Sequence, residues 1–125
     1  MAVFPSYYEP WGYTPLESAA FKVPTVTSDL AGFGLWVNTL LKRDAEIEDG
    51  VKVVHRTDGN WNEAAADISL QIEKWVSKSS AEREEIRQKA GKLAEKALWK
   101  HFIKYYLEAY QFAIDKTWTK IYNNR

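Results

Sequence analysis

The sequence predicts an α/β fold: a small three-stranded parallel sheet followed by three mostly long helices. Three observations support this prediction. Residues 1–59 alternate short apolar or β-branched runs with helix-start signals, residues 60–125 contain no proline, and the apolar residues of this second part recur at helical spacing. The order strand, helix, strand, helix, strand is typical of parallel strands joined by right-handed crossovers.

The composition excludes several classes of protein. A length of 125 residues is enough for one domain. The 17 basic residues balance 17 acidic ones, so no net charge attracts nucleic acid, and no apolar run approaches the roughly 18 residues of a membrane span. The absence of cysteine excludes disulfides and thiolate chemistry, and two histidines leave little material for a metal site. We therefore expect a cytoplasmic protein with no metal, no membrane span and no nucleic-acid partner.

The three predicted strands are short, apolar or β-branched, and bounded by Pro, Gly or polar residues. They are residues 3–4, 24–27 and 51–54. Residues 35–43 are predicted to form a short helix between the second and third strands. The segment 44–49 that follows this helix carries four carboxylates in six residues, which predicts a solvated loop.

A capped helix start follows the first strand. Thr14 is a good N-cap, Pro15 fits the first helical position, and Glu17 completes a capping box. This helix is predicted to end near Lys22. Its N-terminus presents backbone N–H groups and a partial positive charge, which suit a phosphate.

Residues 60–125 are predicted to form three helices. Asn60 and Glu63 supply the N-cap and capping box of the first, which runs to about residue 77, and Ser79 or Ser80 caps the second. The predicted apolar face of the first helix comprises Ile68, Ile72, Trp75 and Val76, and that of the second comprises Ile86, Ala90, Leu93, Ala94 and Ala97.

The last predicted helix, which reaches about residue 122, is apolar on more than one side. One stripe consists of Trp99, Phe102, Ile103, Tyr106, Tyr110, Ala113 and Ile114, and a second consists of Leu98, Tyr105, Phe112 and Trp118. The chain as a whole has six Trp, seven Tyr and five Phe, more than so small a core needs. The pattern therefore predicts that this helix packs against more than one partner.

The carboxyl ends of the predicted strands are the expected place for a ligand, as in other open parallel sheets. Residues 5–13, 28–34 and 55–59 occupy these positions. No nucleotide-binding glycine fingerprint, nucleophile elbow or H-E-x-x-H motif occurs in the chain. The distinctive feature is a pair of carboxylates, Glu9 and Glu17, that brackets a turn and the helix start.

Two strings near the start of the chain are more specific. Residues 5–17 are Pro-Ser-Tyr-Tyr-Glu-Pro-Trp-Gly-Tyr-Thr-Pro-Leu-Glu, and residues 23–34 are Val-Pro-Thr-Val-Thr-Ser-Asp-Leu-Ala-Gly-Phe-Gly. The first resembles the E-x7-E segment of glycogen synthases of the family-3 glycosyltransferase type, the animal and fungal enzymes. The second resembles the next strand of that family and its T-x-L-S-G-F-G loop, with Ala31 where serine is usual. Residues 49–54 are similar to its Y-G-x-Y-I-V strand, and residues 99–106 to its W-K-Y-L-G-R-Y-Y helix.

The resemblance covers nearly the whole chain and implies a GT-B architecture of two Rossmann-like domains. Residues 1–125 correspond to the C-terminal part of the second domain, with residues 1–59 as its β/α portion and residues 60–125 as its helical portion, and the N-terminal domain is absent. The implied reaction is retaining transfer of glucose from UDP-glucose or ADP-glucose to an α-1,4-glucan, without a cofactor or a required metal. The chain alone is expected to be inactive.

The same resemblance implies roles for single residues. Glu9 is the catalytic candidate, implied to contact donor-glucose hydroxyls and to stabilise positive charge on the sugar ring. Gly12, Tyr13 and Thr14 are implied to bring backbone N–H groups to the sugar and the distal phosphate. Glu17 is implied to bind ribose hydroxyls, and its role as capping-box partner of Thr14 is the alternative.

Other residues near the expected cleft have two interpretations. Trp11 and Tyr13 are candidates for the wall of the donor pocket, with packing as the alternative. Residues 32–34 are expected to shape the domain near the cleft rather than to touch the donor. His55 and His101 are expected to be structural.

The helix before residue 99 departs from the family pattern. Eukaryotic members carry an Arg-rich helix there that responds to glucose-6-phosphate, and its leading Arg pair is replaced here by Ser80 and Ala81. Glu84 and Glu85 dilute the charge of this helix further. The departure predicts a bacterial member of the family that glucose-6-phosphate does not strongly activate.

A second class of function stays open. The aromatics of the last helix could serve a carbohydrate-binding or oligomerisation module, with glucan or a second copy as the partner. The first strand, residues 3–4, would lack its usual neighbour, so it is predicted either to pair with another copy or to be short and frayed. A homo-oligomer could therefore form through the sheet edge or through the last helix.

Overall fold

The computed structural model describes the backbone of residues 1–123 and the side chains of residues 1–117. The chain divides into two compact units, Met1–Glu95 and Lys96–Arg125. The side chain of Trp118, which is predicted to extend the second apolar stripe of the last helix, lies outside the described residues.

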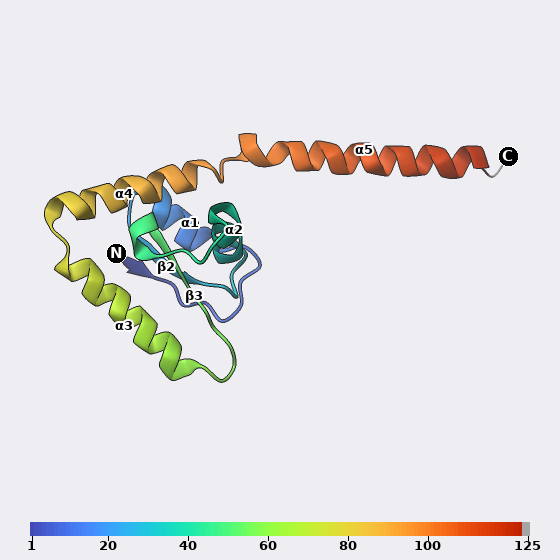
Figure 1. Cartoon of the computed structure of the whole chain (residues 1–125). Helices are drawn as coiled ribbons and strands as arrows, with labels where there is room; N and C mark the ends of the chain where they lie inside the picture. Colours follow the sequence, from blue (N-terminus) through green and yellow to red (C-terminus); the bar gives the residue numbers. More distant parts are fainter. Residues whose placement is uncertain (124–125) are drawn as a thin grey trace. The chain divides into compact units, whose positions relative to one another are not determined.

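The first unit is built on a three-stranded parallel sheet in the order β1-β2-β3, as predicted. The strands are β1 (Ala2–Val3), β2 (Thr25–Ser28) and β3 (Val51–Val54), shown in Figure 1. Thr25 of β2 pairs with Ala2 on one side and with Val51 on the other. β2 is thus the central strand, and all four of its residues are buried. β1 has only two residues, in agreement with the prediction of a short edge strand.

The helices follow in the predicted order, and a 3-10 helix precedes β3. They are α1 (Tyr13–Ala20), α2 (Gly32–Leu41), the 3-10 helix η1 (Ile47–Asp49), α3 (Trp61–Ser77), α4 (Ser80–Glu95) and, in the second unit, α5 (Trp99–Asn123). This arrangement confirms the predicted α/β class and the three helices after the sheet.

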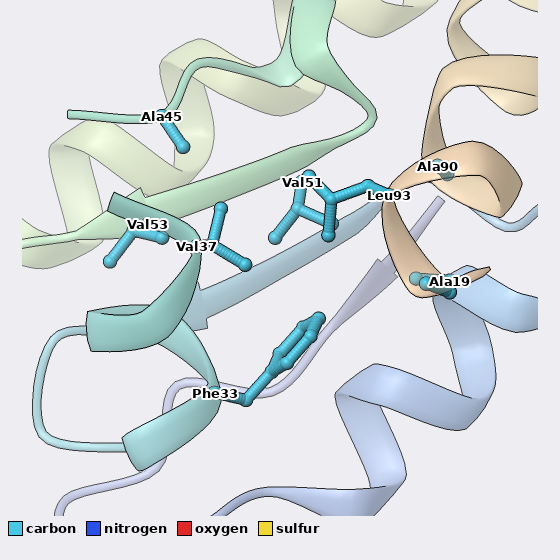
Figure 2. Packing of buried hydrophobic residues seen from close by; sticks show 9 residues of the cluster. Ala19, Phe33, Val37, Ala45, Val51, Val53, Ala90 and Leu93 are labelled. Carbon is cyan, nitrogen blue, oxygen red and sulfur yellow. The ribbon is translucent and has the colours of Figure 1, made fainter. Parts of the chain in front are cut away.

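One face of the sheet carries the hydrophobic core. Val51 and Val53 of β3 pack there with Phe33 and Val37 of α2 (Figure 2). The cluster is completed by Ala19 of α1, by Ala45 in the segment before η1, and by Ala90, Leu93 and Ala94 of α4. Phe33 is fully buried, and burial of such a side chain contributes about 2–3 kcal/mol. The apolar face predicted for α4 is confirmed, except that Ala97 lies beyond the end of that helix.

The opposite side of β3 is polar where α3 covers it. Side chains alternate along a strand, so Lys52 points away from Val51 and Val53. Its Nζ lies 3.0 Å from Oε1 of Glu46 and 3.4 Å from Oδ2 of Asp67 on α3. The buried lysine is therefore neutralised by carboxylates that come from two segments.

The apolar face predicted for α3 is confirmed only in part. Ile68 and Trp75 are half-buried, as predicted, but Ile72 and Val76 are 42% and 64% exposed, and the fully buried positions are Ala64 and Gln71. The reason is the buried Lys52 opposite this helix, because α3 turns Asp67 toward the ammonium group. The buried side chain of Gln71 supports this carboxylate, because its Nε2 donates to Oδ1 of Asp67 at 2.8 Å.

The capping box predicted for α1 does not form. Gly12 occupies the N-cap position in the left-handed conformation, with φ of 110°, and no side chain caps the helix. α1 therefore begins at Tyr13, and Thr14 and Glu17 both lie inside it. The glycine turn rather than a threonine hydroxyl sets the start of this helix.

The later helix starts follow the predictions in part. Asn60 occupies the N-cap position of α3 without a side-chain cap, because its Oδ1 accepts from the Thr57 N–H at 2.7 Å and its Nδ2 donates to the His55 carbonyl. The predicted capping box with Glu63 is therefore wrong. Before α4, the Oγ of Ser79 accepts from the backbone of Glu82 while the Glu82 carboxylate accepts from the Ser79 N–H at 2.8 Å, as expected for a cap.

The acidic segment 44–49 is not the predicted solvated loop. Ala45 and Ile47 are fully buried, and Ile47 begins η1. Asp49 accepts from both terminal nitrogens of Arg43, at 2.8 and 2.7 Å, and from the Glu46 N–H at 3.0 Å. Burial by itself would raise the pKa of Asp49, but these hydrogen bonds outweigh it and lower the pKa below its ordinary value.

α5 presents its aromatic stripes on the surface of the second unit. The rings of Trp99 and Tyr106 lie 4.8 Å apart, and every side chain from residue 104 to residue 117 is exposed. Tyr110 and Phe112 are more than 60% exposed, at 62% and 68%. No helix among the described residues combines the length and the hydropathy needed to cross a membrane.

Replacement of Asp49 by Asn is expected to lower the free energy of unfolding by about 1–2 kcal/mol at pH 7, because it weakens the hydrogen bonds from Arg43 and Glu46. A carboxyl whose folded pKa is lowered stabilises the protein above its unfolded pKa of about 3.9, and this contribution is lost as the pH falls through the folded value. Thermal unfolding followed by circular dichroism from pH 7 to about pH 2 should therefore show the wild-type and Asp49→Asn curves converging in acid. Glu63→Gln, on the exposed side of α3, is the control. A difference that persists undiminished in acid would contradict this account.

Candidate functional site

The candidate site lies where β1 and β2 end, at the carboxyl edge of the sheet. Residues 5–13 follow β1 and residues 28–34 span the end of β2, as the sequence predicts. Backbone hydrogen bonds join the two segments: the Glu9 N–H donates to the Leu30 carbonyl at 3.2 Å, and the Gly32 N–H donates to the Glu9 carbonyl at 3.1 Å. Glu9 and Ala31 therefore form a parallel bridge beyond the end of β1.

Gly32 allows this close approach between the two loops, and Gly34 allows a second one within the loop after β2. A Cβ atom at Gly32 would lie 2.3 Å from the Pro10 carbonyl oxygen, and one at Gly34 would lie 2.2 Å from the Ser28 carbonyl oxygen. Both residues belong to the first turn of α2, so the prediction that this helix starts at residue 35 is wrong. Phe33 between them is fully buried, so this turn shapes the edge of the sheet; the expectation that residues 32–34 do not touch the donor stays a prediction.

Glu9 borders an open pocket of about 320 Å³. The pocket is lined by Val3, Phe4, Pro5, Ser6, Glu9, Thr14 and Pro15. The hydroxyl of Ser6 donates to Oε2 of Glu9 at 3.1 Å. This bond fixes the carboxylate at the pocket, where its two oxygens are suited to accept hydrogen bonds from sugar hydroxyls.

The start of α1 lies next to the same carboxylate. A Cβ atom built on Gly12 would lie 3.6 Å from Oε2 of Glu9, so the glycine turn passes directly beside it. The first N–H groups of an α-helix have no partner within the helix, and Pro15 has no N–H to offer. The amides of Tyr13 and Thr14 are therefore the donors of the first turn. The structure thus brings together Glu9, Gly12 and Thr14.

The other predicted site residues are placed differently. The ring of Trp11 packs against Phe33 and Trp36, with centroids 6.2 and 6.0 Å apart, which favours the packing interpretation for Trp11. Tyr13 is 68% exposed at the helix start. Glu17 is exposed one turn further along α1 and does not line the pocket. Substrate binding by these three residues stays a prediction.

A polar cluster at the ends of β2 and β3 completes the edge. Oδ1 of Asp29 accepts from the Arg56 N–H at 2.9 Å, and Oδ2 of Asp29 lies 2.5 Å from Nδ1 of His55. This contact joins His55 to the loop after β2, and its structural role stays a prediction. No sequence motif indicates a role for Ser6, Asp29 or Arg56. The signal that they do carry is their position shortly after the strands of a parallel sheet.

The arrangement provides hydrogen-bond acceptors on a carboxylate and hydrogen-bond donors on a helix N-terminus, side by side. A sugar hydroxyl suits the first and a phosphate oxygen suits the second. Among the described residues, no group of three His, Cys, Asp or Glu side chains is placed to hold a metal ion.

A three-stranded parallel sheet joined by crossover helices defines an α/β protein, and its candidate ligand site lies at the carboxyl edge of the sheet. Comparison with known proteins places the chain more narrowly, because the family model described as Glycogen synthase matches residues 1–125. The chain belongs to the glycogen synthase family, as the resemblance of its sequence strings predicts.

Individual relatives agree with this assignment. Glycogen [starch] synthase isoform 1 of Saccharomyces cerevisiae is 31% identical over 118 residues, which cover 94% of this chain and 17% of the relative. Glycogen [starch] synthase of Neurospora crassa is 29% identical over 123 residues, covering 98% of this chain and 17% of the relative. The liver Glycogen [starch] synthase of Homo sapiens is 28% identical over 116 residues, which cover 93% of this chain and 16% of the relative. The chain thus spans less than a fifth of the length of the curated relatives it matches.

Substitution of Gly32 by Ala is expected to lower the free energy of unfolding by about 2–3 kcal/mol, because the new methyl group would overlap the Pro10 carbonyl. Gly59→Ala is the matched control, since a Cβ at Gly59 meets nothing within 4 Å. Its effect should stay within about 0.5 kcal/mol. Urea unfolding of both variants measures the difference, and equal midpoints would refute the close approach.

Proposed function

We propose that this chain forms the donor-binding part of a retaining glucosyltransferase that uses UDP-glucose or ADP-glucose and extends an α-1,4-glucan. Membership of the glycogen synthase family supports the class of reaction. The observation that carries the proposal is the Glu9 carboxylate, held by Ser6 at the pocket beside the start of α1. The cytoplasmic location and the independence of metal are further predictions of this proposal.

Glu9 is proposed to act on the sugar ring of the donor. Loss of a nucleoside diphosphate leaves positive charge on the ring carbon and oxygen, and a fixed carboxylate stabilises such charge as it develops. Its hydrogen bond to Ser6 keeps it oriented before the donor arrives, so less reorganisation accompanies the reaction.

The N-terminus of α1 is proposed to bind the distal phosphate of the donor, which is joined to the glucose ring. Gly12 permits a ligand to approach the backbone, and the N–H groups of Tyr13 and Thr14 are donors for the sugar and the distal phosphate. Glu17, one helical turn from Tyr13, is proposed to accept from ribose hydroxyls. Its capping-box alternative is not realised in the structure, which favours a free role for this carboxylate.

Glu9→Gln in the full-length protein that contains this chain should lower kcat about 100-fold to 1,000-fold, because the amide removes the negative charge but keeps the shape. The donor KM should change less than about threefold, since the charge acts mainly on the transition state. Initial rates of glucose transfer measure both constants, and Glu63→Gln on α3 is the control. Wild-type kcat in the Glu9→Gln protein would contradict the proposed role.

A second function, glucan binding by α5, is favoured by the exposure of Trp99, Tyr110 and Phe112. Aromatic rings stack on the apolar faces of sugars, and exposed rings are available for this contact. Isothermal titration calorimetry on the 125-residue chain separates the two functions. Donor binding that is lost in Glu17→Ala supports the donor site, whereas maltooligosaccharide binding that is lost in Tyr110→Ala and kept in Glu108→Ala supports the second function.

A further inference from the structure

Arg56 connects two loops that the sheet order keeps apart. It follows β3, whereas the loop with Glu9 follows β1, and β2 lies between these two strands. The Arg56 side chain reaches past the end of β2, and its Nη1 donates to the Pro5 carbonyl. This contact ties the loops of both outer strands together.

The backbone at Arg56 is itself fixed from the central strand. Asp29 is the first residue after β2, and its N–H donates to the Val54 carbonyl at 3.1 Å. Its carboxylate in turn accepts from the Arg56 N–H at 2.9 Å. The guanidinium group therefore extends from an anchored main chain.

Two aromatic rings hold the guanidinium group. Its Cζ lies 5.7 Å from the centroid of Tyr7 and 4.9 Å from that of Trp61. Asp58 fixes both rings, because the Tyr7 hydroxyl donates to its carboxylate and Nε1 of Trp61 donates to its carbonyl at 2.9 Å. A planar guanidinium stacks on such rings and still donates in its own plane, which a lysine ammonium does not do.

The chain of contacts ends at Glu9. Pro5 and Tyr7, which both contact Arg56, flank Ser6 in the sequence. The Ser6 carbonyl accepts from the Ser28 hydroxyl at 2.5 Å, and the Ser6 hydroxyl donates to Oε2 of Glu9. Arg56 is not among the residues that line the pocket, so it acts on the carboxylate through Pro5 and Ser6.

We infer that Arg56 is a positioning residue that holds residues 5–8 in place, so that Ser6 keeps the Glu9 carboxylate at the pocket. The catalytic consequence rests on the proposed function of Glu9, whereas the positioning itself does not. Displacement of a reacting group by about 1 Å costs about 100-fold in rate, so a contact outside the pocket is enough to affect kcat.

The kinetic test compares Arg56→Lys and Arg56→Ala with wild type in the full-length protein. Both variants should lower kcat, by about tenfold and about 100-fold, and should change the donor KM less than about threefold. Arg43→Lys is the matched control, because Arg43 also makes paired contacts through its guanidinium group but with Asp49 in η1. It should lower the melting temperature and leave kcat within about twofold.

A second measurement on the 125-residue chain keeps the inference testable without catalysis. Amide hydrogen exchange followed by mass spectrometry should become at least about tenfold faster over residues 5–9 in Arg56→Lys, and should stay unchanged there in Arg43→Lys. Unchanged exchange over residues 5–9 in Arg56→Lys would overturn the inference. Faster exchange there together with a wild-type kcat in an active protein would overturn only its catalytic consequence, and with it the proposed role of Glu9. A wild-type protein that transfers no glucose, together with the expected exchange, would refute the proposed function and leave the positioning role supported.

Discussion

The backbone bridge between Glu9 and Ala31 is the interaction on which the rest of the site depends. It extends the pairing of the β1 and β2 segments beyond the strands themselves and fixes the main chain of the residue that carries the candidate catalytic carboxylate. The bridge exists because Gly32 lets the backbone approach the Pro10 carbonyl. Loss of these hydrogen bonds would leave partly buried backbone groups without partners, which costs about 1–3 kcal/mol for each group.

The bridge also explains why neighbouring features occur together. The Phe33 N–H donates to the Trp11 carbonyl at 2.5 Å, so the buried ring of α2 and the ring of Trp11 are held against each other. The chain then turns at Gly12 and starts α1 next to the carboxylate. A single network thus links the hydrophobic core, the helix start and Glu9, and a rigid support of this kind is what an oriented carboxylate requires.

The order of elements could be predicted from the sequence, because β-branched runs, prolines and helical spacing are local signals. The residues of β3 and the cap at Ser79 follow directly from such signals. Two predictions failed, in whole or in part, where a residue distant in the sequence decides the outcome: the face of α3 depends on Lys52 of β3, and the start of α2 depends on the Pro10 carbonyl. The acidic segment is ordered by its neighbour Arg43, through a pairing with Asp49 that the count of carboxylates does not indicate.

The candidate site, too, has one part that the sequence predicts and another part that it does not. Glu9, Gly12 and Thr14 come together as the sequence strings imply, since they lie close along the chain. The hydrogen bond from Arg56 to the Pro5 carbonyl joins residues 51 positions apart, and no local sequence pattern indicates that contact. The sequence also leaves the role of Trp11 undecided, because an aromatic residue suits both the wall of a ligand pocket and a position in the hydrophobic core.

The central claim is that the Glu9 bridge is a fixed part of the sheet and not a mobile loop. Amide exchange resolved by NMR in the wild-type chain tests this claim most directly. The amides of Glu9 and Gly32 should exchange within about tenfold of the amides of β2, because they open only when the sheet opens. Exchange of both amides as fast as that of the exposed Gly59 would contradict the account.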